Sequence, residues 1–294
     1  MTQPTLSSRR GVLFLITAML IFSLLNALIK GQTSYYPPLQ LVFFRCFFAA
    51  IPATVCLIYQ RKWESPPASI WKTYALRAIL IATAFTLLFK GIGELPLSDS
   101  MALYFSSTFF LVILSYPILR EKVSAIQWIA TLIGLVGILL VANPSGDVVH
   151  MGTLLIIGGA CLEATHNLLG RLIAPSQNAY MITFIGSLLP GLLLFIFLPF
   201  VWVTPDLNGW IALLTLGIGG GIGQLCVTFA YTHAPAGILA PMIYSAMIWS
   251  VLLDIVLYEN WPTHSLLGGC AIIIFSGLLI LVSESRKNKK KNPS

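Results

Sequence analysis

The stretch from Met151 to Leu172, MGTLLIIGGACLEATHNLLGRL, is long and apolar enough to cross a lipid bilayer as a helix, which needs about 20 residues at ~1.5 Å rise each. Glu163, His166 and Asn167 nevertheless lie inside it. Glu163 comes ~18 Å along the helix, near the middle of a hydrocarbon layer ~30 Å thick. A carboxylate there costs ~2.5–3.5 kcal/mol to insert, so it usually faces protein or a water-filled cavity. The i, i+3 and i, i+4 spacings place all three side chains on one helix face. We expect that face to handle a polar molecule.

The whole chain has the composition of an integral membrane protein. Of its 294 residues, 57% are hydrophobic and 9% are charged, whereas soluble domains contain about 25% charged residues. The net charge of +7 does not indicate nucleic-acid binding, because five of the seventeen basic residues lie between positions 286 and 291, a pattern typical of a cytoplasmic segment beside anionic lipid. The five cysteines form no CxxC pair or metal-ligand spacing, so we expect no metal and no cofactor. The expected partners are the lipid bilayer and a small-molecule substrate.

Ten apolar stretches follow one another with short connections, many of which contain Pro, Gly or Asn. This pattern predicts an all-α membrane protein with ten transmembrane helices, and it leaves no room for an extramembrane domain. The predicted spans are residues 11–30, 37–59, 71–92, 97–119, 124–142, 151–172, 178–200, 209–232, 236–258 and 264–283.

Basic residues are distributed unevenly over the connections. With the N-terminus in the cytoplasm, thirteen of the seventeen lie on the cytoplasmic side and only Lys30 and Lys90 on the other, while Arg45 and Arg77 lie within spans. This positive-inside pattern predicts a multi-pass protein of the bacterial inner membrane with both termini in the cytoplasm.

The two halves of the sequence resemble each other. Asn26–Lys30 in the first span corresponds to Asn167–Arg171 in the sixth, 141 positions later, and Gly137–Val141 corresponds to Gly277–Leu281, 140 positions later. Five spans per half is an odd number, so the halves must have opposite orientations, which is a hallmark of secondary transporters. The predicted units are a first five-helix repeat at 1–145, a second five-helix repeat at 146–285 and a basic cytoplasmic tail at 286–294.

The chain resembles EamA-type members of the drug/metabolite transporter superfamily over essentially its whole length. The resemblance is carried by LVFFRCFFA from Leu41 to Ala49, by PILREKVSAIQW from Pro117 to Trp128, and by the second-half pattern from Ala240 to Ile280. It implies two inverted five-helix repeats around a central cavity lined mainly by spans 1, 3, 4, 6, 8 and 9. Members of the family move amino acids, nucleosides, S-adenosylmethionine, sugars and organic cations. Glu163 and the start of span 9 are most similar to the S-adenosylmethionine-uptake branch.

Glu163 and His166 are the strongest candidates for substrate binding. The carboxylate could titrate, pair with a cationic group of the substrate, or exchange a proton with the imidazole; the alternative is a buried pair that holds span 6 to a neighbour. Asn26 and Asn167 should point inward, either as gates or as helix-packing hydrogen bonds. Aromatic residues inside the spans either pack or form a box for a cationic or heteroaromatic group. The predicted substrate-binding residues are Glu163, His166, Asn167, Asn26, Tyr104, Gln224, Tyr244 and Trp249.

Further charged residues lie near the ends of spans. Lys90 and Glu94 are spaced i, i+4 and form either a gate or a solvated pair worth ~0.5 kcal/mol. Arg45 lies within span 2, where it could have a charged partner or snorkel toward the outer headgroups. Because an arginine at this place is typical of the family that the chain resembles, we favour a structural role. The glycine-rich run from 217 to 223 lacks the Lys-Ser/Thr ending of a phosphate-binding loop, so it indicates close helix packing or a hinge. The predicted gating residues are Lys30, Lys90, Glu94 and Arg171.

These observations predict a secondary active transporter that moves a small amine-bearing or zwitterionic metabolite, such as an amino acid or a compound like S-adenosylmethionine, by alternating access. Because the sequence shows no nucleotide-binding motif, we expect a substrate or ion gradient to drive transport, with protons or a counter-substrate as coupling partners. A passive exchanger, a multidrug or organic-cation exporter and a lipid flippase are the alternatives. We expect no catalytic residues, since no nucleophile–base or HExxH pattern is present. The oligomeric state stays open between monomer and homodimer.

Overall fold

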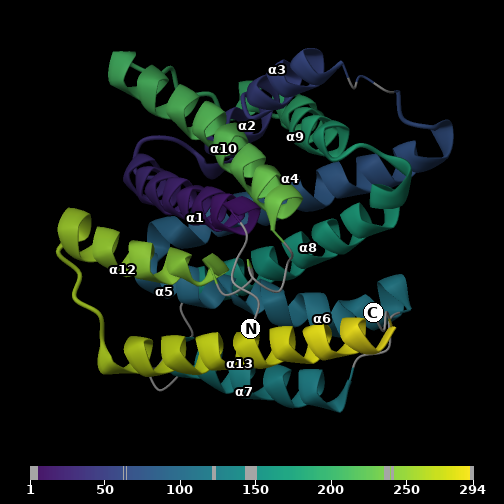
Figure 1. Ribbon diagram of the computed structural model, residues 1–294. Helices are drawn as coiled ribbons and strands as arrows, with labels where there is room; N and C mark the ends of the chain where they lie inside the picture. Colours follow the sequence, from purple (N-terminus) through teal and green to yellow (C-terminus); the bar gives the residue numbers. More distant parts are fainter. Residues whose placement is uncertain are drawn as a thin grey trace.

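The computed structural model describes residues 6–61, 63, 65–120, 124–142, 151–234, 239 and 242–291, and every regular element within them is helical (Figure 1). Three short 3₁₀ turns occur at Ala68–Ile70, Ala174–Ser176 and Leu198–Phe200. The α-helices are α1 (Leu6–Gln32), α2 (Pro38–Phe47), α3 (Ala50–Gln60), α4 (Trp71–Glu94), α5 (Leu97–Tyr104), α6 (Ser106–Leu119), α7 (Ala125–Ala142), α8 (Met151–Ile173), α9 (Ala179–Phe195), α10 (Leu207–His233), α12 (Ser245–Tyr258) and α13 (His264–Lys291).

The predicted all-helical architecture is confirmed, with differences inside three of the predicted spans. Span 37–59 is divided into α2 and α3, and span 97–119 is divided into α5 and α6 at Phe105. The last helix continues beyond position 283 to Lys291. Ala240 and Pro241 in span 9, the motif residues 121–123 and the predicted boundary at 145 lie outside the described residues, as do the last three residues of the predicted tail.

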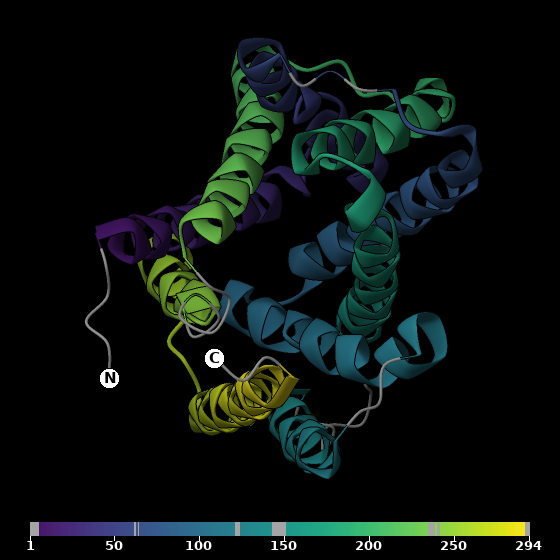
Figure 2. The same ribbon diagram turned by 45° about the vertical axis from the view of Figure 1, so that its right-hand side comes forward.

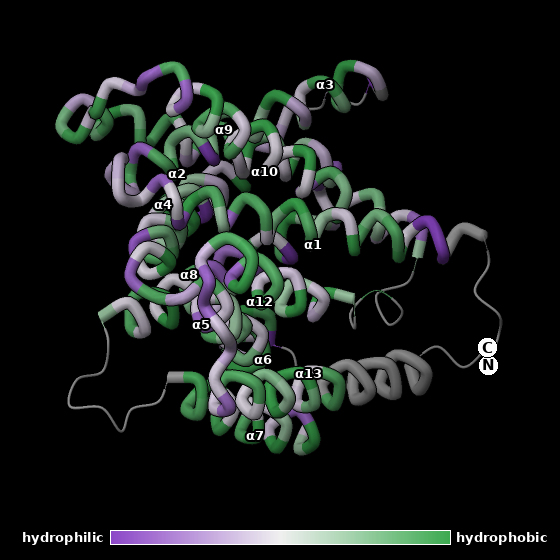
Figure 3. The backbone as a smooth tube through the Cα atoms, turned by 90° about the vertical axis from the view of Figure 1, so that its left-hand side faces the viewer, coloured by the Kyte–Doolittle hydropathy of each residue, from purple (hydrophilic) through white to green (hydrophobic). Residues whose placement is uncertain are grey.

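Most helices are apolar along their length (Figure 3). Within the described residues, five helical stretches are long and apolar enough to cross a membrane, and four shorter apolar helices accompany them. The helix α8 belongs to neither group, because its polar residues lower its hydropathy. Large apolar side chains remain exposed, such as Ile129 and Leu132 of α7 at 57% and 61%, as expected for a surface that faces lipid. The long apolar stretches are Arg9–Gln32, Pro38–Tyr59, Ala68–Glu94, Leu97–Leu119 and Leu207–His233.

The helices pack in a pattern that is unchanged when the two halves are exchanged. The first helix of each half packs against the third span of the other, so that α1 contacts α10 and α8 contacts α4. The second spans contact each other through α2 and α9, and the fifth through α7 and α13. In Figure 2 the helices form a ring around the centre of the molecule. This exchange symmetry is what two inverted five-helix repeats require.

Two close contacts join the first half of the chain to the second. Phe105, between α5 and α6, and Tyr244, directly before α12, lie 139 positions apart, and their rings stack with centroids 5.1 Å apart. At the contact between α7 and α13, a Cβ added at Gly137 would lie 2.9 Å from the Gly269 carbonyl oxygen, and one added at Gly269 would lie 2.7 Å from the Gly137 carbonyl oxygen. Glycine at both positions therefore allows the two helix backbones to approach closely.

Candidate functional site

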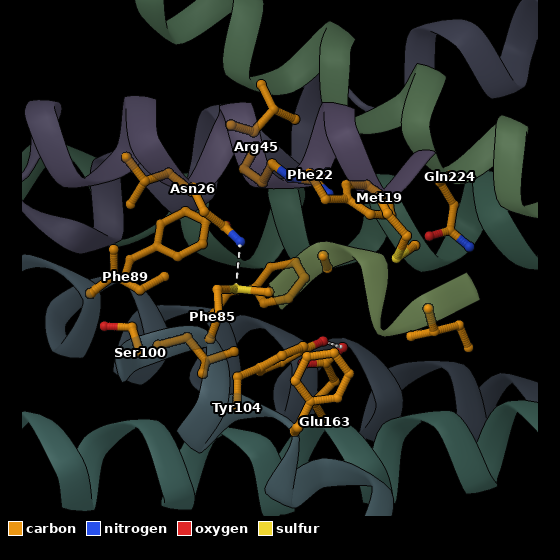
Figure 4. A pocket seen from close by; sticks show the side chains of 18 residues that line it. Met19, Phe22, Asn26, Arg45, Phe85, Phe89, Ser100, Tyr104, Glu163 and Gln224 are labelled. Carbon is orange, nitrogen blue, oxygen red and sulfur yellow. Dashed lines mark hydrogen bonds between the residues drawn. The ribbon is translucent and has the colours of Figure 1, made fainter. Parts of the chain in front are cut away.

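A cavity of about 230 Å³ lies beside Glu163, between α1, α4, α5 and α8 (Figure 4). We call it the Asn26 cavity, after the amide that α1 places in it. Its walls are mainly apolar and aromatic, and they include Phe22, Phe85 and Phe89. A small number of polar groups in an apolar pocket is the usual composition of a small-molecule site.

Glu163 is held at the edge of this cavity by a tyrosine from the first half of the chain. The Tyr104 hydroxyl donates a 2.6 Å hydrogen bond to Glu163 Oε1. The other carboxylate oxygen, Oε2, is buried and has no hydrogen-bond partner among the described residues. Because a buried polar atom without a partner is costly, this oxygen is a site where a ligand donor would be stabilised. In Figure 4 the Tyr104–Glu163 pair lies on one side of the cavity and Arg45 on the other.

The Arg45 guanidinium lies between two aromatic rings. Its Cζ atom is 5.8 Å from the centroid of Phe22 and 5.7 Å from that of Phe85, so cation–π attraction from two sides stabilises the charge. The guanidinium also lies against α10, where a side chain at Gly220 would overlap it. A Cβ at Gly220 would therefore displace the guanidinium from this position.

A second cavity, of about 170 Å³, adjoins the first. We call it the Asn167 cavity. The Asn26 cavity is lined by residues of α4 from Phe85 toward the C-terminus of that helix, and the Asn167 cavity by residues of α4 from Phe85 back to Arg77. The two cavities therefore lie toward opposite ends of the bundle. Four residues line both cavities, and we call them the shared wall: Arg45, Phe85, Glu163 and Gln224.

His166 lies in the Asn167 cavity but does not pair with Glu163. Its Nδ1 lies 2.9 Å from the Arg77 carbonyl oxygen, and its Nε2 lies 3.1 Å from Arg77 Nη2. Since a carbonyl oxygen only accepts, the geometry assigns the proton to Nδ1 and leaves Nε2 to accept from the arginine. Arg77 Nε also donates to the His166 carbonyl oxygen over 3.3 Å. The imidazole thus joins α8 to α4, and Glu163 has Tyr104 as its partner instead.

The remaining predicted binding residues are divided between the cavities and the core. Asn26 donates over 3.2 Å to Met101 Sδ in the first cavity, and Asn167 lies exposed in the second. Gln224 belongs to the shared wall and is exposed. Tyr244 and Trp249 line neither cavity; Tyr244 stacks on Phe105, and Trp249 packs against the apolar core with its buried Nε1 unpartnered among the described residues.

Of the predicted gating residues, Lys30 makes the most contacts. Its Nζ donates a 2.5 Å hydrogen bond to the Leu95 carbonyl oxygen and lies 5.1 Å from the Tyr258 ring centroid. Lys90, Glu94 and Arg171 are exposed at helix ends and line neither cavity. Their roles stay predictions.

Sequence reasoning assigned no functional role to two charged residues that line the cavities, Arg45 and Arg77, or to the buried Asp254, which lines neither. Arg45 received a structural role, although it lies in the shared wall. Arg77 and Asp254 received no role, although Arg77 lines the second cavity and the buried Asp254 accepts hydrogen bonds from the Ser98 backbone N–H and hydroxyl at 2.9 and 2.6 Å. Their rarity within apolar spans was the one available signal. Among the described residues, no group of three or more His, Cys, Asp or Glu side chains is placed to hold a metal ion.

The sequence model of the EamA-like transporter family matches residues 9–143 and again residues 150–282. The chain therefore belongs to this family and contains its domain twice. It is a membrane transporter, as its apolar helices also indicate.

Three bacterial relatives align with most of the chain. An uncharacterized transporter of Helicobacter pylori strain J99 is 30% identical, with 96% of this chain and 97% of the relative covered. A riboflavin transporter of Vibrio cholerae is 26% identical, with 96% of each chain covered. An S-adenosylmethionine uptake transporter of Rickettsia bellii is 23% identical, with 86% of each covered.

A solved crystal structure has the same fold. It superimposes with a TM-score of 0.67 at 19% sequence identity and covers 94% of this chain and 98% of that chain.

Proposed function

We propose that the protein is a secondary active transporter that moves a small amine-bearing or zwitterionic metabolite across the inner membrane by alternating access. The observation that carries the proposal is the buried Glu163 carboxylate in a wall shared by two cavities. A ligand bound at this wall is within reach of either cavity, so opening one end and closing the other would move it across the membrane.

The chemistry of the wall supports a cationic group on the substrate. Glu163 Oε2 lacks a donor within the described part of the chain, and the Tyr104 hydrogen bond fixes the carboxylate so that Oε2 is left available. An ammonium group supplies both a donor and a compensating charge. The phenylalanine rings that line the Asn26 cavity suit an apolar or aromatic part of the same molecule.

The relatives support this class without naming one substrate. One of them is named for S-adenosylmethionine, which carries an amine, a carboxylate and a heteroaromatic ring, and another for riboflavin, which carries a heteroaromatic ring. A flat heteroaromatic group is common to both, and the aromatic walls of the Asn26 cavity fit it.

The proposal is tested with Glu163→Gln, which keeps the shape of the side chain and removes its charge. We expect uptake of radiolabelled amines and amino acids into proteoliposomes to fall by about tenfold or more, because a charge-assisted hydrogen bond is lost. Glu259→Gln is the matched control, since Glu259 is exposed after α12 and lines neither cavity. Unchanged uptake by Glu163→Gln, with an unchanged preference for cationic substrates, would show that the carboxylate is structural.

A further inference from the structure

The charged groups that line the two cavities do not balance one another. Arg45, Arg77 and Glu163 are the charged side chains among the lining residues of both cavities, so two cations face one carboxylate. Taking a charge out of water is costly, and an unneutralised charge persists inside a membrane protein mainly where it contacts water or binds an ion.

Arg45 forms no hydrogen bond within the described part of the chain. The Glu163 carboxylate attracts its guanidinium through space, and the rings of Phe22 and Phe85 lie beside it. The planar group offers five N–H donors in a fixed fork, which matches the two oxygens of a carboxylate. Phe22 and Phe85 lie beside this group, and its Nη1 and Nε atoms lie against Gly220 of α10.

The Arg45 guanidinium and the Glu163 carboxylate each line both cavities. Arg45 and Glu163 lie on opposite sides of the space drawn in Figure 4 and are not joined by a hydrogen bond. Tyr104 already occupies Glu163 Oε1, so Oε2 is directed to another partner. Among the described residues, the Arg45 guanidinium has no acceptor and Glu163 Oε2 has no donor, and both side chains line the same cavities. The pair is therefore complementary to a molecule that carries an anionic and a cationic group close together.

We infer that Arg45 binds the carboxylate of the transported molecule, while Glu163 binds its cationic group. The substrate class is then a zwitterionic amino acid or amino-acid derivative, which is narrower than an amine. Because both residues belong to the shared wall, they hold the ligand from whichever cavity it enters. This inference rests on the proposed function. It assigns a binding role to Arg45, whose guanidinium contacts the rings of Phe22 and Phe85 and the surface of α10 but forms no hydrogen bond with the described residues.

The second cavity supports the same assignment. Arg77 is 6% exposed, and its Nη1 is buried without a hydrogen-bond partner among the described residues, although its other nitrogens bind His166. Arg77 therefore adds positive potential to the Asn167 cavity, which attracts a carboxylate toward the shared wall.

The test uses pairs of ligands that differ only in the carboxylate: L-phenylalanine and phenethylamine, L-histidine and histamine, and S-adenosylmethionine and its decarboxylated form. Binding to the purified full-length protein is measured by ligand-induced thermal stabilisation and titration. We expect at least one carboxylate-bearing member to bind about tenfold or more tightly than its amine, as a bidentate charged pair would produce. Arg45→Gln should remove this preference and change the affinity for the amine less than about threefold.

Two further variants separate binding from structure. Arg10→Gln is the control, because Arg10 is exposed near the start of α1 and lines neither cavity. Arg45→Lys keeps the charge and loses the fork, so it should reduce the carboxylate preference in a protein that still folds. A purely structural arginine would weaken both members of a pair equally, in whichever variant folds.

Equal binding of both members by the unmodified protein and by the Arg45 variants would overturn the inference and leave the proposed amine transport intact. Failure of every pair to bind the unmodified protein would instead contradict the proposed substrate class, and the inference with it.

Discussion

The two ends of the bundle carry equivalent sequence motifs but differ in the hydrogen bonds that their described residues form. At the first, the Lys30 end, Lys30 binds the Leu95 carbonyl oxygen, and the Tyr258 hydroxyl donates to the Ala27 carbonyl oxygen over 2.7 Å. Asp254 joins α12 to α5 through Ser98. At the second, the Arg171 end, Arg171 occupies the position equivalent to Lys30 but is exposed and makes no hydrogen bond with any described residue.

This difference indicates how a symmetric sequence can adopt an asymmetric state. In the described residues, α1, α5 and α12 are tied together beyond the Asn26 cavity, whereas Asn167 is exposed in the other cavity. Two arrangements of similar packing, related by the exchange of the repeats, are what alternating access needs. In that interpretation the structure has the Lys30 end closed and the Arg171 end open. The second state would have the Lys30 end open and the Arg171 end closed. The predictions that follow test the comparison, beginning with the largest expected effect.

The largest effect should be on the accessibility of the two equivalent asparagines. In a protein without its native cysteines, we expect Asn167→Cys to react with a water-soluble maleimide at least about tenfold faster than Asn26→Cys, because Asn167 is exposed whereas α1, α5 and α12 are joined beyond Asn26 by described hydrogen bonds. Saturating substrate should narrow this ratio. The cysteines to replace are Cys46, Cys56, Cys161, Cys226 and Cys270.

Two exposed sites serve as controls for reagent access at the two ends. Ser34→Cys lies in the turn after α1 and Ser176→Cys lies just after α8, and both should react quickly. Equal and fast labelling at positions 26 and 167 without substrate would contradict the closed Lys30 end and favour a channel.

Asp254→Asn should open the Lys30 end. The carboxylate accepts two hydrogen bonds from Ser98, and an amide keeps its shape but weakens both. We expect labelling of Asn26→Cys to accelerate about threefold or more, because bonds to a charged acceptor are the stronger ones. Asp206→Asn is the control, since Asp206 caps α10 and asparagine caps a helix as well as aspartate does. If both substitutions leave the rate unchanged, Asp254 does not hold this end closed.

Lys30→Met and Arg171→Met compare the equivalent positions directly. Lys30→Met removes the bond to Leu95 and should lower the free energy of unfolding by ~1–2 kcal/mol. Arg171→Met should change it by less than about 0.5 kcal/mol, as is usual for an exposed residue. Thermal unfolding of both variants in the same detergent measures the difference. Equal destabilisation would mean that the two ends are held equally.

Tyr258→Phe should have the smallest effect. It removes only the hydroxyl that donates to the Ala27 carbonyl oxygen, which corresponds to ~0.5–1.5 kcal/mol of stability. Tyr116→Phe removes a hydroxyl from a side chain that is 61% exposed, so it should be close to neutral. A stability loss in Tyr116→Phe as large as that in Tyr258→Phe would show that the bond to Ala27 contributes nothing specific.

The sequence alone was sufficient to predict that the chain is all-helical and where most of its helices lie. Hydrocarbon requires every backbone polar group to be satisfied within its own segment, so long apolar runs predict helices without knowledge of their neighbours. The predicted helix from 151 to 172 corresponds to Met151–Ile173. The shared helix face of Glu163 and His166 also follows from local geometry, because i, i+3 spacing is a property of one helix.

Only the tertiary structure decided the partners of these polar residues. Glu163 binds Tyr104, 59 positions away, and His166 binds Arg77, 89 positions away. Spacing along one helix says which side chains share a face but not which other helix packs against that face. For the same reason the sequence did not show that Tyr244, whose binding role stays a prediction, stacks on Phe105, or that Arg45, for which a structural role was favoured, lines both cavities. Contacts between helices from opposite halves decide whether the Lys30 end or the Arg171 end of the bundle is held by hydrogen bonds. No single segment of the sequence contains that information.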